Sequence, residues 1–291
     1  MCVAFWTLDH PEYALILCNN RDEFLARPAL AASFHSFRDA QSNVATDAHF
    51  NSDDPAATVA EDAVLSGRDT QAGGTWFGLA PQSGRVALLT NITEPYQSLP
   101  SSRGALAPAF LLTQRARAQW AASAAPAVRS LHFPHAALLS NGGAGGQLQS
   151  RPLRADERAS GGLSNGLFVD GAGGEAWPKV VQGRALFAEA LKAHDAEAEV
   201  LADADATDAA LARRLFALLR TTTAEPVRAR EELRRTICVR PLDTIAAGPS
   251  GSSKWYGTRT ASVLLVRRSG EALFVERDVW RIQPGGGRRA V

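Results

Sequence analysis

Two apolar runs at the start of the chain place the strongest constraint on its fold, because together they predict a β-hairpin. The runs VAFWTL (residues 3–8) and YALILC (residues 13–18) are rich in aromatic and branched residues, which favour strands. The DHPE segment between them carries Asp and Pro, which are typical of turns. We therefore predict an antiparallel pair whose first strand begins directly after Cys2.

Similar runs further along the chain predict more strands, several of them in hairpins. They cover residues 75–80, 85–91, 136–140, 162–170, 261–268 and 271–279. Apolar residues at helical spacing predict three helices, around residues 106–111, 180–191 and 211–218. Pro178 suits a first helical turn, and Thr207 and Asp208 are the candidate caps of the last helix.

Strands in hairpin runs with separate helices favour an α+β fold, in which helices cover antiparallel sheets. The periodicity does not distinguish one sheet from two stacked sheets. No shift in composition marks a boundary, so we expect a single domain over residues 1–291. Polar stretches near residues 38–62 and 194–208 are expected to be surface insertions, and residues 284–291 a frayed tail.

The charge balance argues against nucleic acid as a partner. Lys and Arg number 31 and Asp and Glu 30, a net charge of +1, and binding to nucleic acid needs clustered cations. Three cysteines are too few for a disulfide framework, which favours a reducing compartment. No apolar run reaches the roughly 20 residues of a membrane-spanning helix. His132 and His135 lack a third ligand, so no metal site is expected.

Cys2 is the first candidate for chemistry, because it follows the initiator methionine. If Met1 is removed, the thiol shares its residue with a free α-amine of pKa about 8, a base that can activate it. The side chain of Cys is small enough to permit this removal. The alternative is that Cys2 is only a small apolar residue at the start of a strand.

Polar residues follow the second predicted strand, as Asn20, Arg21, Asp22 and Glu23. A hairpin brings the end of its second strand back beside the start of the first, so Asp22 or a neighbour can approach Cys2. The alternative is a solvated turn with local ion pairs.

Two asparagines also follow predicted strands. Asn91 ends ALLTN and Asn165 ends GLSN, and each side-chain amide could stabilise a developing oxyanion. Asparagine is equally common in turns, which is the alternative for each residue taken singly.

An ordered set of motifs resembles the NRDE family, also called the transport and Golgi organization 2 family. The motifs run in order through nearly the whole chain: MC at residues 1–2, NNRDEF at 19–24, SGRD at 66–69, GGTWFG at 73–78, ALLTN at 87–91, SRG at 102–104, LSN at 163–165, WPKV at 177–180 and YGTRTASVLL at 256–265.

That family is similar to the N-terminal nucleophile hydrolases, in particular to the cysteine group of choloylglycine hydrolases and penicillin V acylases. The resemblance implies a four-layer αββα sandwich of two antiparallel sheets. It implies that Cys2 is the nucleophile, that Asp22 orients the α-amine, and that Asn91 and Asn165 contribute to the oxyanion site. Arg259 resembles an arginine near the thiolate.

Further side chains are expected to contact the substrate: Asn20, Arg21, Glu23, Arg68 and Trp76. The chain departs from the hydrolase group at one position. That group has an Arg three residues before the Asp, whereas this chain has Asn19 there and its Arg at position 21. Activation of the thiol or handling of the substrate is expected to differ accordingly.

Two functions remain open at this stage. The first is hydrolysis of an amide or thioester by Cys2, which needs no metal or organic cofactor. The second is a binding or trafficking protein for a hydrophobic ligand such as haem, acyl-CoA or a lipid, because the family name concerns Golgi organization and secretion and its members are linked with lipid or haem handling. Membrane attachment through a palmitoylated Cys2 or Cys18 is the least favoured reading. The family implies a cytoplasmic protein that can associate with the Golgi or with mitochondria.

Overall fold

The structure, a computed structural model, describes residues 1–37, 62–92, 102–112, 133–140, 147–166, 177–198, 203–243, 255–282 and 288–290. The domain expected over residues 1–291 consists of two compact units. Unit 1 comprises residues Met1–Ala26, Thr90–Gln97 and Val128–Val291, and unit 2 comprises Arg27–Leu89 and Ser98–Ala127. The architecture is α+β, and every described strand pairing is antiparallel.

Unit 1 is built on a six-stranded sheet in the order β10-β11-β2-β1-β9, with β12 also paired to β11. The strands are β1 (Val3–Thr7), β2 (Tyr13–Phe24), β9 (Gly161–Ser164), β10 (Leu242–Asp243), β11 (Trp255–Arg267) and β12 (Ala272–Asp278). The N-terminal hairpin therefore lies in the middle of the sheet, and β1 is flanked by β2 and β9. Shorter pairs are β7 (Ala137–Ser140) with β8 (Gln149–Pro152), and β13 (Trp280–Ile282) with β14 (Arg288–Ala290).

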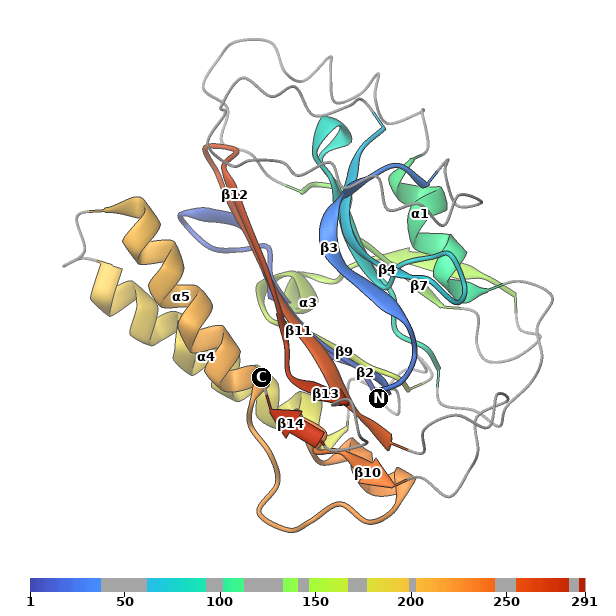
Figure 1. Ribbon diagram of the computed structural model, residues 1–291. Helices are drawn as coiled ribbons and strands as arrows, with labels where there is room; N and C mark the ends of the chain where they lie inside the picture. The colour runs from blue at the N-terminus through green and yellow to red at the C-terminus, as the bar shows by residue number, and fades with distance from the viewer. Residues whose placement is uncertain are drawn as a thin grey trace. The chain divides into compact units, whose positions relative to one another are not determined.

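Two long helices cover one face of this sheet, α4 (Pro178–Ala198) and α5 (Ala204–Leu219) (Figure 1). Their apolar faces and the inward side chains of β1, β2 and β11 form one core cluster. Packing between helix and sheet is close at Gly183 of α4, where a Cβ atom would lie 2.0 Å from the ring of Phe5. The Phe5 and Phe187 rings stack with centroids 6.5 Å apart. A residue without a side chain is therefore required where α4 crosses β1. Unit 1 also contains the short helix α3 (Ala155–Ala159) and the 3₁₀ helix η5 (Arg230–Arg234).

Unit 2 contains a four-stranded sheet in the order β3-β4-β5-β6. Its strands are β3 (Ala29–His35), β4 (Val64–Asp69), β5 (Phe77–Ala80) and β6 (Arg85–Leu88), and its helices are η2 (Pro81–Ser83), η3 (Arg103–Ala105) and α1 (Leu106–Leu111). Leu111 of α1 packs with Val64 and Ala80. Leu106 and Phe110, which the spacing predicts on the same buried face, are each about half exposed instead, at 50% and 49%.

Several predicted boundaries differ from the structure. The second strand continues to Phe24 because its polar residues pair with β11, whereas the sequence predicted an end at Cys18. Within the insertion expected at 194–208, residues 194–198 are the last residues of α4, with His194 buried, and residues 204–208 are the first residues of α5. Asp203 caps α5 instead of Thr207 or Asp208, and accepts hydrogen bonds from the backbone of Asp205 and Ala206.

Within the expected tail, residues 288–290 form β14 and pair with β13. The predicted insertion near 38–62 falls almost entirely outside the described residues. Among the residues that the structure describes, no helix is long and apolar enough to cross a membrane.

Candidate functional site

Cys2 directly precedes β1, an inner strand of the large sheet, and so lies at one end of that strand. Val3 pairs with Asn20 of β2 on one side and with Ser164 of β9 on the other. The Ser164 hydroxyl donates to the carbonyl oxygen of Cys2 at 2.6 Å, and the Cys2 Sγ lies 3.9 Å from the carbonyl oxygen of Asp22. Cys2 is partly exposed, whereas Cys18 and Cys238 are buried. It is therefore the thiol that a substrate can reach most easily.

The carboxylate of Asp22 binds the terminal amine. Its side chain is fully buried, and Oδ2 lies 2.9 Å from the Met1 nitrogen. Its other oxygen, Oδ1, accepts a hydrogen bond of 2.6 Å from Thr258, the residue directly opposite on β11. Tyr256, two residues earlier on β11, accepts a hydrogen bond from the terminal amine and donates to the Asp22 carbonyl at 3.2 Å. The β2–β11 pairing thus fixes the carboxylate against the start of the chain.

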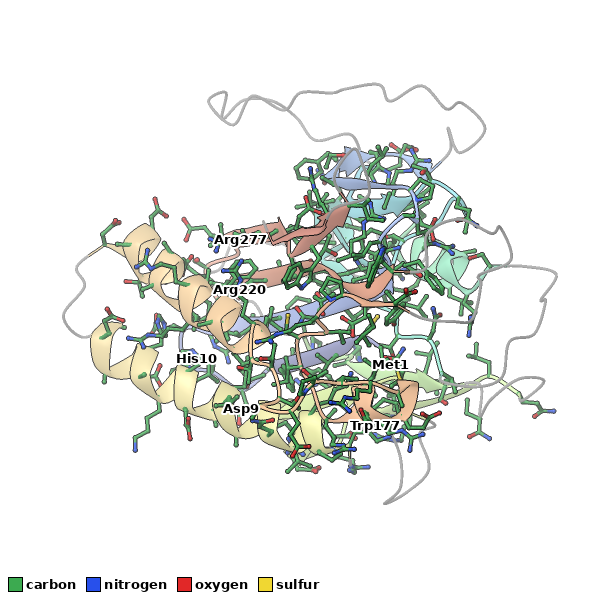
Figure 2. The ribbon with its side chains drawn as sticks, turned by 60° about the horizontal axis from the view of Figure 1, so that its bottom comes forward. Met1, Asp9, His10, Trp177, Arg220 and Arg277 are labelled. Carbon is green, nitrogen blue, oxygen red and sulfur yellow. The ribbon has the colours of Figure 1, made fainter. Side chains whose placement is uncertain are left out.

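A buried lysine completes the surroundings of Cys2. Lys179 is 0% exposed and lies in the first turn of α4, where the helix dipole disfavours a cation. Its ammonium donates to the Met1 carbonyl at 2.6 Å and approaches the Cys2 carbonyl at 3.5 Å. The Lys179 Nζ also lies 5.7 Å from the centre of the Trp177 ring. Figure 2 shows Met1 and Trp177 in the same part of unit 1, where α4 begins.

Burial dominates the ionisation of these groups. It lowers the pKa of the terminal amine, although the Asp22 carboxylate opposes this. It lowers the pKa of Lys179 to about 8, again against the effect of Asp22. It raises the pKa of the Cys2 thiol, which the neighbouring amine only partly offsets. While Met1 is attached, the thiol is therefore neutral near pH 7, and Lys179 releases its proton at a lower pH than an exposed lysine does.

The two predicted oxyanion residues lie together. Asn165 directly follows Ser164 of β9, is buried, and donates its side-chain amide to the backbone carbonyl of Asn91. Asn91 is exposed and lies three residues after the end of β6. Because Ser164 contacts Cys2, this pair lies at the same end of β1 as the thiol.

The arginine of YGTRT occupies a bulge in β11. Thr258 pairs with Asp22 and Thr260 with Arg21, so Arg259 is the extra residue between them. Bulges redirect a side chain and are frequent next to functional sites. Burial, and secondarily Arg21, lower the pKa of Arg259, while Asp278 and then Glu23 oppose this. Arg21 itself lies 3.9 Å from Glu23. Arg259 of β11 therefore forms one charged group with Arg21 and Glu23 of the neighbouring strand β2.

The remaining predicted residues have other surroundings. Asn20 is 0% exposed, and its amide donates to the carbonyls of Leu219 and Ile237 at 2.8 and 3.0 Å, so it ties β2 to segments outside the sheet. Arg68 and Trp76 belong to unit 2. There Arg68 lies 5.8 Å from the Phe37 ring centre, and the Trp76 ring packs against Gly67. No group of three or more His, Cys, Asp or Glu side chains in the described part of the chain could hold a metal ion.

Sequence reasoning did not identify Lys179, Ser164, Tyr256 or Thr258 as site residues. All four lie inside the motifs WPKV, LSN and YGTRT. Tyr256 and Thr258 could have been found by extending the strand predicted at 261–268 toward its N-terminal end, where it pairs with the polar end of β2. Nothing in the local sequence signals the burial of Lys179, because lysine is one of the residues least often buried.

The lowered pKa of Lys179 predicts a specific dependence of stability on pH in the protein that carries Met1. Between about pH 8 and the unfolded value near 10.5, the folded state binds fewer protons at Lys179 than the unfolded chain. The free energy of unfolding of the wild type should therefore rise with pH in this window relative to Lys179→Met, by up to about 1 kcal/mol per pH unit. Urea unfolding at several pH values measures the difference.

Lys192→Met is the matched control for this experiment, because Lys192 is an exposed lysine on the same helix. Its difference from the wild type should stay flat over the same pH range. A flat difference for Lys179→Met as well would show that Lys179 is ionised as an exposed lysine is.

Comparisons with known proteins agree on the family. The family model described as Transport and Golgi organisation 2 matches residues 1–281. The chain is 28% identical to the Transport and Golgi organization protein 2 homolog of Bos taurus over 301 residues, which cover 98% of this chain and 95% of the relative. It is 26% identical to the Transport and Golgi organization 2 homolog of Mus musculus over 296 residues, 96% of this chain and 93% of that protein. The protein therefore belongs to the Transport and Golgi organisation 2 family.

Proposed function

We propose that this protein is a cysteine hydrolase of the N-terminal nucleophile type, which cleaves an amide or thioester after removal of Met1. The observation that carries this proposal is the ion pair between the buried Asp22 carboxylate and the terminal amine of Met1, next to Cys2, a partly exposed residue. A buried carboxylate that receives the chain terminus is the arrangement that an α-amine base requires.

In the proposed reaction the α-amine of Cys2, oriented by Asp22, accepts the thiol proton. The sulfur then attacks the acyl carbonyl, a C–S bond forms, and the proton passes to the leaving amine or thiol. Water hydrolyses the resulting thioester, which releases the acid and restores the thiol. Asn165 and Asn91 are proposed to stabilise the oxyanion, Arg259 to act near the thiolate, and Arg21 and Glu23 to contact the substrate. Two positions support these roles: Asn165 directly follows β9, and Arg259 lies in the β11 bulge between the partners of Asp22 and Arg21.

We also propose that the fold is the four-layer αββα sandwich of this hydrolase class. Two features support it: the nucleophile begins a central strand, and two helices cover one face of an antiparallel sheet. The motif resemblance supports it independently. Fold resemblance alone does not assign an activity, so the enzymatic proposal depends on the chemistry at Cys2.

A second candidate function is favoured by the burial of Met1. Met1 is only 5% exposed, and its amine is ion-paired, so a protein that keeps Met1 gives Cys2 no free α-amine. Burial then keeps the thiol protonated by raising its pKa. In that form we propose a binding protein for a hydrophobic ligand such as haem, acyl-CoA or a lipid.

For the cellular role, we propose transport and Golgi organization, the process in the names of the similar proteins. Protein secretion and lipid or haem homeostasis are the processes in which such a hydrolase or binder would act. We propose a cytoplasmic location with association to the Golgi or to mitochondria.

The test compares two preparations whose intact masses establish the presence or absence of Met1. One comes from an ordinary host and the other from a host without methionine aminopeptidase activity. Each is assayed with acyl p-nitroanilides and with acyl thioesters of N-acetylcysteamine. We expect turnover only from the protein that lacks Met1. Equal turnover by both would remove the α-amine from the mechanism, and none from either would favour the binding protein.

A further inference from the structure

Met1 shows which kind of acyl group fits beside Cys2, because the Met1 residue is itself an acyl group attached to the nitrogen of Cys2. Its carbonyl oxygen receives a hydrogen bond of 2.6 Å from the Lys179 ammonium. Its side chain is 5% exposed and belongs to the apolar cluster that contains Trp177. A flexible aliphatic chain is therefore enclosed here while its carbonyl faces a buried cation.

Removal of Met1 changes both halves of this environment. It vacates an apolar space as long as a methionine residue, and it takes away the nearest acceptor of Lys179. The remaining acceptor, the Cys2 carbonyl, lies at 3.5 Å and already receives a hydrogen bond from Ser164. A buried ammonium without a close acceptor is unfavourable, so the vacated site favours a ligand that brings a carbonyl oxygen and an apolar chain together.

We propose that Lys179 and the space filled by Met1 become the acyl-binding site of the processed protein, and that its substrate is an amide or thioester of a short, unbranched acyl group. This inference rests on the proposed function. The hexanoyl group matches the methionine residue in chain length. Lys179 holds the acyl oxygen while Cys2 Sγ bonds to the acyl carbon, and the leaving group departs with the thiol proton. Longer chains would meet the packed core around the end of the Met1 side chain.

The position of Lys179 supports a catalytic role beyond packing. The cation lies at the beginning of a helix and inside the core, two locations that disfavour its charge. Its pKa of about 8 leaves it mostly protonated near pH 7. A charged donor held beside a carbonyl oxygen in a buried site is the arrangement that stabilises a developing oxyanion.

The experiment uses Met1-free protein with the acetyl, hexanoyl and dodecanoyl thioesters of N-acetylcysteamine. We expect kcat/KM for the hexanoyl thioester to exceed that for the acetyl thioester by about 100-fold, since each buried methylene contributes severalfold. The dodecanoyl thioester should be slower than the hexanoyl. Equal rates for hexanoyl and dodecanoyl thioesters would overturn the enclosed site.

Lys179→Met tests the role of the cation. It should lower kcat for the hexanoyl thioester by about 100-fold with a smaller change in KM, while Lys192→Met leaves both constants unchanged. Wild-type activity should fall at high pH as Lys179 loses its proton, and Lys179→Arg, which keeps its charge, should not show that fall. An unchanged kcat in a folded Lys179→Met protein would overturn the assignment.

A measurement of hexanoate binding distinguishes a failure of the proposed acyl site from a failure of the proposed hydrolase activity. If Met1-free protein turns over no donor, the proposed hydrolase fails, and hexanoate binding still tests the acyl site. Titration calorimetry on Met1-free Cys2→Ala protein should show hexanoate binding that Lys179→Met weakens about tenfold or more. Equal affinity in the two proteins, or no binding by Cys2→Ala protein, would overturn the site.

Discussion

Cys2→Ala protein is expected to lose turnover of every acyl donor by about 1000-fold or more, because no other group can take the place of the nucleophile. The substitution keeps a small residue at position 2, so Met1 is removed as in the wild type. It also leaves the hydrogen bond from Ser164 to the carbonyl oxygen of residue 2 in place. The loss of activity therefore reports on the thiol and not on the chain terminus.

Cys238→Ala is the control for this substitution. Cys238 is a buried thiol of the same core, and burial raises its pKa to about 11, which makes it unreactive near pH 7. Its removal should leave turnover within about twofold of the wild type. Equal loss in both variants would indicate that the substitutions disturb the fold. Full activity of Cys2→Ala would contradict the nucleophile directly.

Asp22→Asn is expected to lower the free energy of unfolding of the Met1-containing protein by about 3 kcal/mol near pH 7, because it leaves a buried ammonium without its carboxylate. The amide can keep the hydrogen bond from Thr258, so the change removes charge and little volume. Burial has already lowered the pKa of the amine and of Lys179. Both can therefore lose protons, which limits the cost.

Because the two amines can lose protons, the destabilisation caused by Asp22→Asn should depend on pH. Without Asp22 the pKa of the terminal amine falls further in the folded state, so the folded variant binds fewer protons than the unfolded chain. The destabilisation should therefore be larger near about pH 6 than near about pH 9. Urea unfolding measures it. Asp195→Asn, which removes a carboxylate that is 55% exposed and paired with His10, should cost less than about 1 kcal/mol.

A pH-independent loss in Asp22→Asn would mean that Asp22 acts through packing alone. In Met1-free protein the same variant should also lose most turnover, because the α-amine is no longer oriented. Retention of wild-type kcat would remove Asp22 from the proposed mechanism.

The hairpin and the two long helices follow from the sequence because each has a strong local pattern. The runs VAFWTL and YALILC, rich in aromatic and branched residues and separated by a turn, predict β1 and the first half of β2, and the helical spacing of apolar residues locates α4 and α5. These patterns depend on residues close together in the chain, so they can be interpreted without knowledge of the tertiary structure.

The polar end of β2 could not be assigned in this way. Asn20 and Asp22 look like turn residues, and they are strand residues only because partners from distant segments satisfy them, namely Leu219, Ile237 and Thr258. The proximity of Asp22 to the chain start was predictable from the hairpin. The contribution of Lys179 was not, since a surface location is the ordinary expectation for lysine.

The most direct test of the central claim is a peptide map, by mass spectrometry, of protein quenched during turnover of the hexanoyl thioester. The account predicts a terminal peptide that lacks Met1 and carries one hexanoyl group on the Cys2 sulfur. Turnover with the acyl group on Cys18 or Cys238, or with Met1 still attached to the acylated peptide, would contradict it.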